Sequence, residues 1–144
     1  MPKFLVLLFL LFSTVVKSQT EITWYTLDDV TFTDKYSEEA QGYYYYPNFG
    51  GSVKALEGKR VLLKGYMLVI DPTKNIYILS RYPYASCFFC GSGGPESIVE
   101  LQLKPDHPKF KMDQIVTISG ILELNYDDIY QCNYILGDAE VHEK

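Results

Sequence analysis

Hydrophobic and polar residues alternate along the second half of the chain in runs of strand length. In one run, Val99, Leu101 and Leu103 alternate with polar residues, which is typical of a strand with one buried face. Runs of this kind cover residues 59–70, 76–80, 97–103, 114–124 and 129–141. No long window repeats every 3.6 residues, so the pattern predicts a mainly β domain with five strands.

Two of these runs carry a glycine in their middle. Gly65 lies in the first run and Gly120 in the fourth, and a glycine inside a strand often marks a bend or a close approach of another backbone. Five strands, two of them bent, are typical of a small five-stranded Greek-key barrel of the oligonucleotide/oligosaccharide-binding type, the OB-fold. Another small antiparallel barrel or sandwich is the alternative architecture.

Residues 19–50 show no comparable pattern. We expect an irregular N-terminal segment here that packs on the barrel, and an OB-like barrel domain over residues 51–144. Strand character in the segment is limited to residues 30–33 and to the tyrosine run 43–46, which Pro47 is expected to end.

A short helical turn is expected where this segment joins the barrel. Ser52 belongs to the residue types that cap helix N-termini, and Gly58 suits the end of a helix. The pattern therefore predicts one helical turn between these two residues.

The first 18 residues have the pattern of a secretory signal peptide. Lys3 precedes an apolar run from Phe4 to Phe12, and a cleavage point lies between Ser18 and Gln19. The apolar run is shorter than the roughly 20 residues that a membrane-spanning helix needs. We therefore expect an exported protein, periplasmic or extracellular, with no transmembrane segment after cleavage.

Charge narrows the class of partner. The 144 residues include 13 Lys and Arg against 18 Asp and Glu, a net charge of −5. Loss of residues 1–18 removes Lys3 and Lys17, which leaves 11 basic residues and a net charge of −7. Nucleic-acid binding requires clustered Lys and Arg, so no nucleic acid is expected as a partner. The partner classes that remain are a protein and a small ligand.

Three cysteines form the only constellation with obvious chemistry. Cys87 and Cys90 have the C-x-x-C spacing of thiol redox motifs and metal knuckles, and Cys132 follows later. In an OB-like barrel the third and fifth strands run parallel side by side. The loop that enters the third strand and the start of the fifth should therefore lie at one end, which brings all three cysteines together.

The residues leave several uses of this cysteine group open. The favoured one is a structural disulfide, either from one loop cysteine to Cys132 or between Cys87 and Cys90 with Cys132 buried. A zinc or copper site is a second use, and its fourth ligand would be water or a nearby carboxylate. Thiol redox catalysis is a third, although residues 91–95 do not read as the helix that lowers a thiol pKa in such motifs. The fourth possibility is that the thiols stay reduced and inert. For the zinc or copper site, the carboxylates that could supply the fourth ligand are Glu96, Asp127 and Asp128.

Aromatic residues surround the cysteine loop. They are Tyr82, Tyr84, Phe88 and Phe89. OB-like barrels often bind ligands along one face, so these rings are a candidate binding surface. The alternative is that they cover the end of the barrel, because hydrophobic residues of a small domain must pack somewhere.

No catalytic pattern is present in the sequence. It contains neither Gly-x-Ser-x-Gly nor His-Glu-x-x-His, and no phosphate-binding glycine loop. We therefore expect no catalytic residues and no cofactor, apart from the zinc or copper considered above.

Two stretches resemble a known family. The first is Pro47-x-Phe49, Val53, Leu56-x-Gly58-Lys59-x-Val61 and Gly65-Tyr66-Met67, and the second is Ser86-Cys87-Phe88-Phe89-Cys90, Pro95 and Ile98-Val99. Over roughly residues 45–140 the chain resembles small exported bacterial proteins called domain of unknown function 3299. The resemblance implies an OB-like fold and export, but no activity. In that family a Pro-rich run, sometimes with a His, follows the loop cysteine, whereas here Phe89 and a glycine-rich stretch follow it.

Together these observations predict an exported, non-catalytic OB-like binding or accessory module whose cysteine–aromatic loop is stabilised by a disulfide. The alternative is a metal-handling (zinc or copper) or thiol-redox protein that uses Cys87, Cys90 and Cys132.

Overall fold

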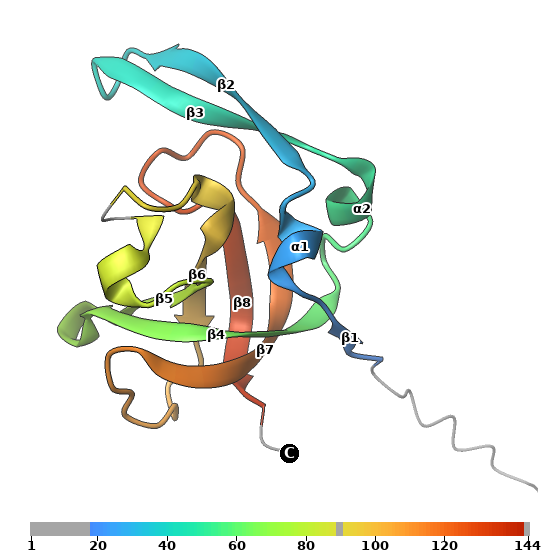
Figure 1. Cartoon of the computed structure of the whole chain (residues 1–144), viewed down its shortest axis with the longest axis vertical. Helices are drawn as coiled ribbons and strands as arrows, with labels where there is room; N and C mark the ends of the chain where they lie inside the picture. Colours follow the sequence, from blue (N-terminus) through green and yellow to red (C-terminus); the bar gives the residue numbers. More distant parts are fainter. Residues whose placement is uncertain (1–17, 89–90, 143–144) are drawn as a thin grey trace, which may run out of the picture.

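The computed structural model of the chain describes residues 18–88 and 91–142 (Figure 1). The strands are β1 Thr20–Glu21, β2 Val30–Ser37, β3 Gly42–Phe49, β4 Arg60–Asp71, β5 Ile76–Ser80, β6 Ile98–Leu103, β7 Gln114–Leu124 and β8 Tyr134–Val141. The helices are α1 Trp24–Leu27 and α2 Gly51–Lys54, with 3-10 turns η1 Pro72–Lys74, η2 Tyr84–Ser86 and η4 Pro95–Ser97.

Five strands close into a barrel. Their order is β4-β5-β6-β8-β7, and β4 pairs again with β7 to complete the circle. All neighbours are antiparallel except β6 and β8, which run parallel. This is the predicted five-stranded OB-type topology with its parallel third and fifth strands, and the expected fold class is confirmed. The short β1 adds a parallel pairing to β4 outside the closed circle.

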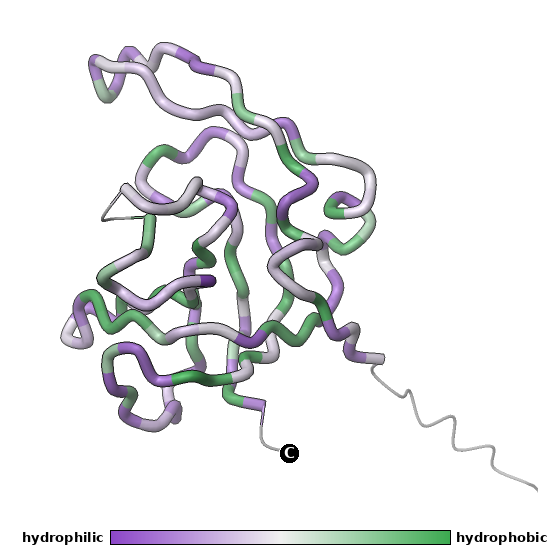
Figure 2. The backbone as a smooth tube through the Cα atoms, viewed as in Figure 1, coloured by the Kyte–Doolittle hydropathy of each residue, from purple (hydrophilic) through white to green (hydrophobic). Residues whose placement is uncertain are grey.

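Alternation along the strands builds the core. Val61, Leu63 and Met67 of β4 are fully buried and meet Ile118 and Leu122 of β7 in one hydrophobic cluster. Figure 2 shows hydrophobic stretches along the barrel strands, whereas the β2–β3 ribbon is neutral to hydrophilic. The sequence pattern therefore marks the barrel, and the ribbon stands outside it.

Strand bounds agree closely with the sequence except at the last strand. β5 and β7 coincide with the expected runs, but β8 begins at Tyr134 rather than at residue 129. The reason is a loop held by Asn125, whose Nδ2 donates to the carbonyl oxygens of Asp128 at 2.7 Å and Cys132 at 3.2 Å. These bonds hold the backbone of residues 125–132 in a turn.

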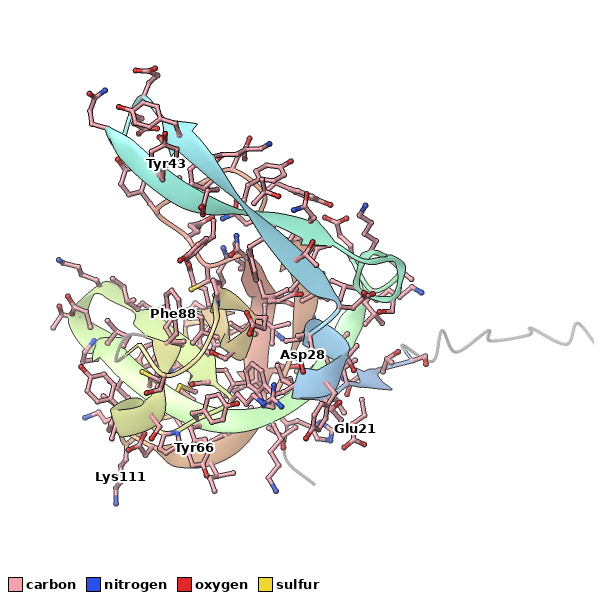
Figure 3. The ribbon with its side chains drawn as sticks, turned by 45° about the horizontal axis from the view of Figure 1, so that its top comes forward. Glu21, Asp28, Tyr43, Tyr66, Phe88 and Lys111 are labelled. Atoms are coloured by element: carbon pink, nitrogen blue, oxygen red, sulfur yellow. The ribbon has the colours of Figure 1, made fainter. Side chains whose placement is uncertain are left out.

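The N-terminal segment is more regular than expected. Residues 19–50 contain the antiparallel hairpin β2–β3 rather than irregular chain. Cross-strand ring pairs support it, with centroids 5.4 Å apart for Tyr36 and Tyr43 and 6.2 Å apart for Phe32 and Tyr45. Figure 3 shows this ribbon reaching away from the barrel, with Tyr43 near its tip.

Pro47 does not end the tyrosine strand, which continues to Phe49. Proline is tolerated there because β3 is an edge strand of a two-stranded ribbon. The prediction that Pro47 terminates the strand was therefore wrong.

The helical turn is present, but Ser52 does not cap it. α2 begins at Gly51 with Gly50 as its N-cap. Asp29, which lies between α1 and β2, instead accepts hydrogen bonds from the Ser52 backbone N, at 3.1 Å, and from the Ser52 hydroxyl. These bonds lower the pKa of the Asp29 carboxyl, because they favour its charged form.

Helix α1 closes one end of the barrel. The buried Tyr134 hydroxyl donates to the Leu27 carbonyl oxygen at 2.8 Å, which ties α1 to β8. Trp24 lies beside Gly65, and its Nε1 donates to the Lys64 carbonyl oxygen at 2.8 Å. Trp24 and Leu27 thus link the N-terminal segment to both β4 and β8.

The signal-peptide prediction concerns residues 1–18, and 1–17 lie outside the described residues. Within the described part of the chain, none of the helices is long and apolar enough to cross a membrane.

Gly65 provides the first test of this packing. A Cβ at this position would lie 2.7 Å from the Ser80 carbonyl oxygen and 2.9 Å from Trp24 Cζ2, so something must move. We expect Gly65→Ala to lower the free energy of unfolding by about 1–3 kcal/mol in urea denaturation.

The control is Gly51→Ala, because a Cβ there meets nothing within 4 Å. The free energy of unfolding of this variant should stay unchanged or rise by up to about 1 kcal/mol, because alanine restricts the conformations of the unfolded chain. Equal stability of both variants would contradict the close approach at Gly65.

Candidate functional site

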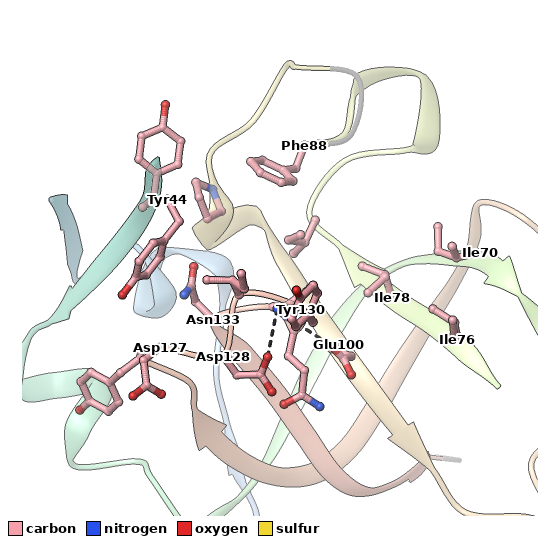
Figure 4. Close-up of a pocket in the computed structure, with 17 residues that line it drawn as sticks. Tyr44, Ile70, Ile76, Ile78, Phe88, Glu100, Asp127, Asp128, Tyr130 and Asn133 are labelled. Carbon is pink, nitrogen blue, oxygen red and sulfur yellow. Dashed lines mark hydrogen bonds between the residues drawn. The ribbon is translucent and has the colours of Figure 1, made fainter. Parts of the chain in front are cut away.

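A pocket of about 390 Å³ lies beside the barrel (Figure 4). Its floor is the outer face of β5 and β6, represented by Ile78 and Ile98. One wall comes from β3 with Tyr44, another from the loop 125–133 with Tyr130, and a third from the cysteine loop with Phe88. The pocket therefore forms between the barrel and the ribbon, from segments far apart in the sequence.

One end of the pocket is apolar. Ile70 of β4 and Ile76 of β5 flank the turn between the two strands, and their side chains are 42% and 41% exposed. Figure 4 shows these two residues next to Ile78, which is buried. Because these isoleucines lie side by side with Ile78 in a concave site, this end of the pocket suits an apolar ligand group.

The other end is acidic. Among residues 18–88 and 91–142, those that line the pocket include Asp127, Asp128 and Glu100 but no Lys, Arg or His. Asp128 is held in its turn because its Oδ1 accepts from the Tyr130 backbone N at 3.0 Å. Within the part of the chain that the structure describes, no hydrogen bond or ion pair engages the exposed Asp127 carboxylate. This end therefore favours cationic or hydrogen-bond-donating groups.

The place of the pocket in the topology is informative. β5 and β6 are the second and third strands of the barrel, and the loops that contribute are those after its second and fourth strands. OB-folds commonly bind ligands on this strand pair and at the loop after the fourth strand. The pocket thus lies on the strand pair that OB-folds use for binding.

Two of the three predicted cysteines, Cys87 and Cys132, belong to one hydrophobic cluster on the outer face of β5 and β6. This cluster also contains Leu68, Ile78 and Ile98. Cys87 is fully buried and Cys132 is half-buried, and both are free thiols.

The expected disulfide is therefore not borne out, because each thiol packs among aliphatic side chains as a small hydrophobic group. Cys90 and Phe89, which belong to the same sequence prediction, lie outside the described residues.

Cys132 is poorly suited to thiol chemistry. Burial, and then the negative charge of Glu100, raise the pKa of its thiol to about 12. Its backbone N donates to Glu100 Oε2 at 3.1 Å, which keeps that carboxylate close. Because the thiolate is the nucleophile and the metal ligand, a thiol that stays protonated at neutral pH weakens the metal and redox hypotheses at this residue.

No metal cluster is present among residues 18–88 and 91–142, where no three His, Cys, Asp or Glu side chains gather to hold an ion. His107 lies in the connector between β6 and β7. Its ring contacts Tyr77 and Phe110, and its Nε2 is 2.9 Å from Asn75 Oδ1.

The predicted aromatic surface is divided by the structure. Phe88 lines the pocket. Tyr82 lies against Arg81, with the guanidinium 5.6 Å from its ring centroid, and the Tyr84 backbone N donates to Asp113 Oδ1 at 2.7 Å. Neither tyrosine belongs to the pocket lining. Whether any of these rings binds a ligand stays a prediction.

Sequence reasoning missed most of the pocket lining. Ile70 and Ile76 were read simply as strand residues, although their exposure on both sides of one turn is what makes the site apolar. A signal was available, because the run 66–70 is apolar on both faces, and a strand with both faces apolar has something to cover on each. Asp127 and Asp128 were considered only as turn residues or metal ligands.

Comparison with known proteins finds the same fold in one crystal structure. The chain is similar to a DUF3299 family protein from Pseudomonas aeruginosa PAO1, at 16% sequence identity and a TM-score of 0.52. The alignment covers 88% of this chain and 98% of that one. None of the family models and none of the curated proteins matches this chain. The resemblance to that family is thus confirmed at the level of the fold.

The raised pKa of Cys132 predicts a loss of stability in alkali. Its ordinary pKa is near 9, so the stabilisation is fully present below pH 9 and is lost as pH rises from 9 towards 12. The free energy of unfolding should fall by up to about 1.4 kcal/mol per pH unit in this range. Burial also raises the pKa of Tyr134, which adds to the loss above its ordinary value of 10.

The measurement is urea unfolding under reducing conditions at pH 7.5, 9 and 10. Cys132→Ala should show a smaller decline between pH 9 and 10 than the unchanged protein, whatever its stability at pH 7.5. An identical decline in both proteins would show that the thiol does not carry the effect.

Proposed function

We propose that this protein is an exported, non-catalytic binding or accessory module of OB type that holds its ligand in the pocket described above. One observation carries the proposal. A concave group of isoleucines lines the pocket on the first three barrel strands, with Ile70 and Ile76 exposed at one end, and it includes the strand pair β5–β6 that OB-folds use for binding.

The energetics support a binding role. Covering apolar surface is worth about 25 cal/mol per Å², and exposed apolar groups in a concave site often mark a binding surface. The pocket also supplies a few polar groups that can orient a ligand, including the Asp127 carboxylate and the Tyr130 side chain. Apolar surface with a few converging polar groups is the usual composition of a ligand site.

A non-catalytic role fits the same lining. Among the described residues that line the pocket, burial raises the pKa of the thiol, Cys132, to about 12, and none is a histidine that could act as a base. The metal-handling or thiol-redox alternative gains no support from the two described cysteines.

The first test uses Nile red, a neutral dye that fluoresces when it enters an apolar site. The double variant Ile70→Ser/Ile76→Ser should bind the dye at least about tenfold more weakly, because it removes the exposed apolar surface of one pocket end. Dye fluorescence titration gives the affinity, and amide NMR shifts locate the site.

Ile115→Ser is the matched control, because Ile115 is 57% exposed on β7 and is not part of the pocket. Its affinity for Nile red should match that of the unchanged protein. Dye binding that maps away from β5 and β6, or that survives the double variant, would contradict the proposed site.

Export is tested on the full-length chain. The proposed signal predicts a mature N-terminus at Gln19, and Leu8→Arg should abolish export because it places a charge in the apolar run. Mass spectrometry of the exported fraction measures the N-terminus, and Leu8→Ile serves as the control. Exported protein that retains residues 1–18 would refute cleavage.

A further inference from the structure

The edge of β3 that faces the pocket is unpaired. Within the described residues β3 pairs with β2 on one side and with no strand on the other. Tyr44 and Tyr45 are successive residues, so their side chains point to opposite faces of the ribbon. Because both line the pocket, it is the edge of β3, rather than one of its faces, that borders the cavity. Figure 4 shows the part of β3 that carries Tyr44 beside the pocket.

The two edges of the ribbon differ in chemistry. β2 carries Asp34 and Lys35, and charged side chains are a common protection against pairing with another chain. β3 carries none, since its sequence is Gly42 to Phe49 with four tyrosines, one proline and one asparagine. The edge without charged side chains is therefore the one that borders the pocket, and over residues 42–46, before Pro47, its backbone N–H and C=O groups can pair with a further strand.

Charge selects the kind of strand. Glu100, Asp127 and Asp128 line the acidic end of the pocket, and none of the described lining residues is basic. The opposite end offers Ile70 and Ile76. Basic side chains complement the first end, and aliphatic side chains complement the second.

We propose that the pocket binds an extended basic–apolar peptide segment of a partner protein, which adds to the free edge of β3 as a third strand of the ribbon. This inference rests on the proposed function, because it names the ligand class of the same pocket. Main-chain hydrogen bonds to β3 supply part of the affinity. The isoleucines and the carboxylates select side chains, which is the usual division in strand addition.

The test uses three synthetic peptides and the mature protein. The first is acetyl-Lys-Thr-Lys-Val-Ile-Val-amide, the second replaces both Lys by Glu, and the third methylates alternate backbone nitrogens. The lysine peptide should shift the amide NMR signals of β3 and the pocket. The glutamate and methylated peptides should bind at least about tenfold more weakly, because they lose charge complementarity and strand pairing respectively.

A pair of protein variants tests whether the acidic end of the pocket attracts the lysine side chains of the peptide. Asp127→Lys should lower the affinity for the lysine peptide at least fivefold and raise the affinity for the glutamate peptide. Asp106→Lys is the control, because Asp106 is equally exposed but lies in the connector between β6 and β7. It should change both affinities less than twofold.

Each result supports or overturns the peptide inference. Nile red binding tests the proposed binding role of the pocket separately from peptide binding. Dye binding in the pocket without peptide binding leaves the binding role in place and overturns the peptide inference, whereas loss of both overturns both. Equal affinity for the methylated peptide overturns strand addition. Cellohexaose that shifts the same signals, with no response to the lysine peptide, assigns the site to oligosaccharides and also overturns the inference.

Discussion

The barrel depends on one strand that serves two partners. β4 pairs with β7 from Arg60 to Met67 and with β5 from Tyr66 to Asp71. Closing a sheet of five strands requires such a strand to bend where it passes from one neighbour to the other. Gly65 lies next to the change of partner at Tyr66 and Met67, and a Cβ there would crowd the Ser80 carbonyl oxygen and the Trp24 ring. Trp24 thus links the N-terminal segment to the point where the barrel closes.

This closure also creates the pocket. Beyond the bend, the end of β4 and the start of β5 extend past the barrel core and carry Ile70 and Ile76 into solvent. The ribbon β2–β3 follows α1, and α1 is held to the barrel by the bond from the Tyr134 hydroxyl to the Leu27 carbonyl oxygen. The ribbon therefore borders the pocket on one side, and the isoleucines line its opposite end.

Parts of this arrangement were predictable and parts were not. The five strands and their parallel third and fifth members follow from period-two alternation and from the known pairing of an OB-type barrel. The disulfide was not borne out, because spacing in the sequence does not tell whether two sulfurs face each other or pack among aliphatic side chains. The hairpin was missed because its stability comes from cross-strand ring pairs such as Tyr36 and Tyr43, which exist only once the register is set.

By itself, the sequence determined the fold class, the bounds of most barrel strands and the net negative charge of the chain. Local alternation is sufficient for the strands, because each strand depends on residues that are close together along the chain. Only the tertiary structure decided where a ligand has room. The pocket joins β3, the loop 125–133 and the turn between β4 and β5, and their distance depends on barrel closure and on the anchoring of α1. No local pattern encodes that distance, since it is set by contacts between residues far apart in the sequence.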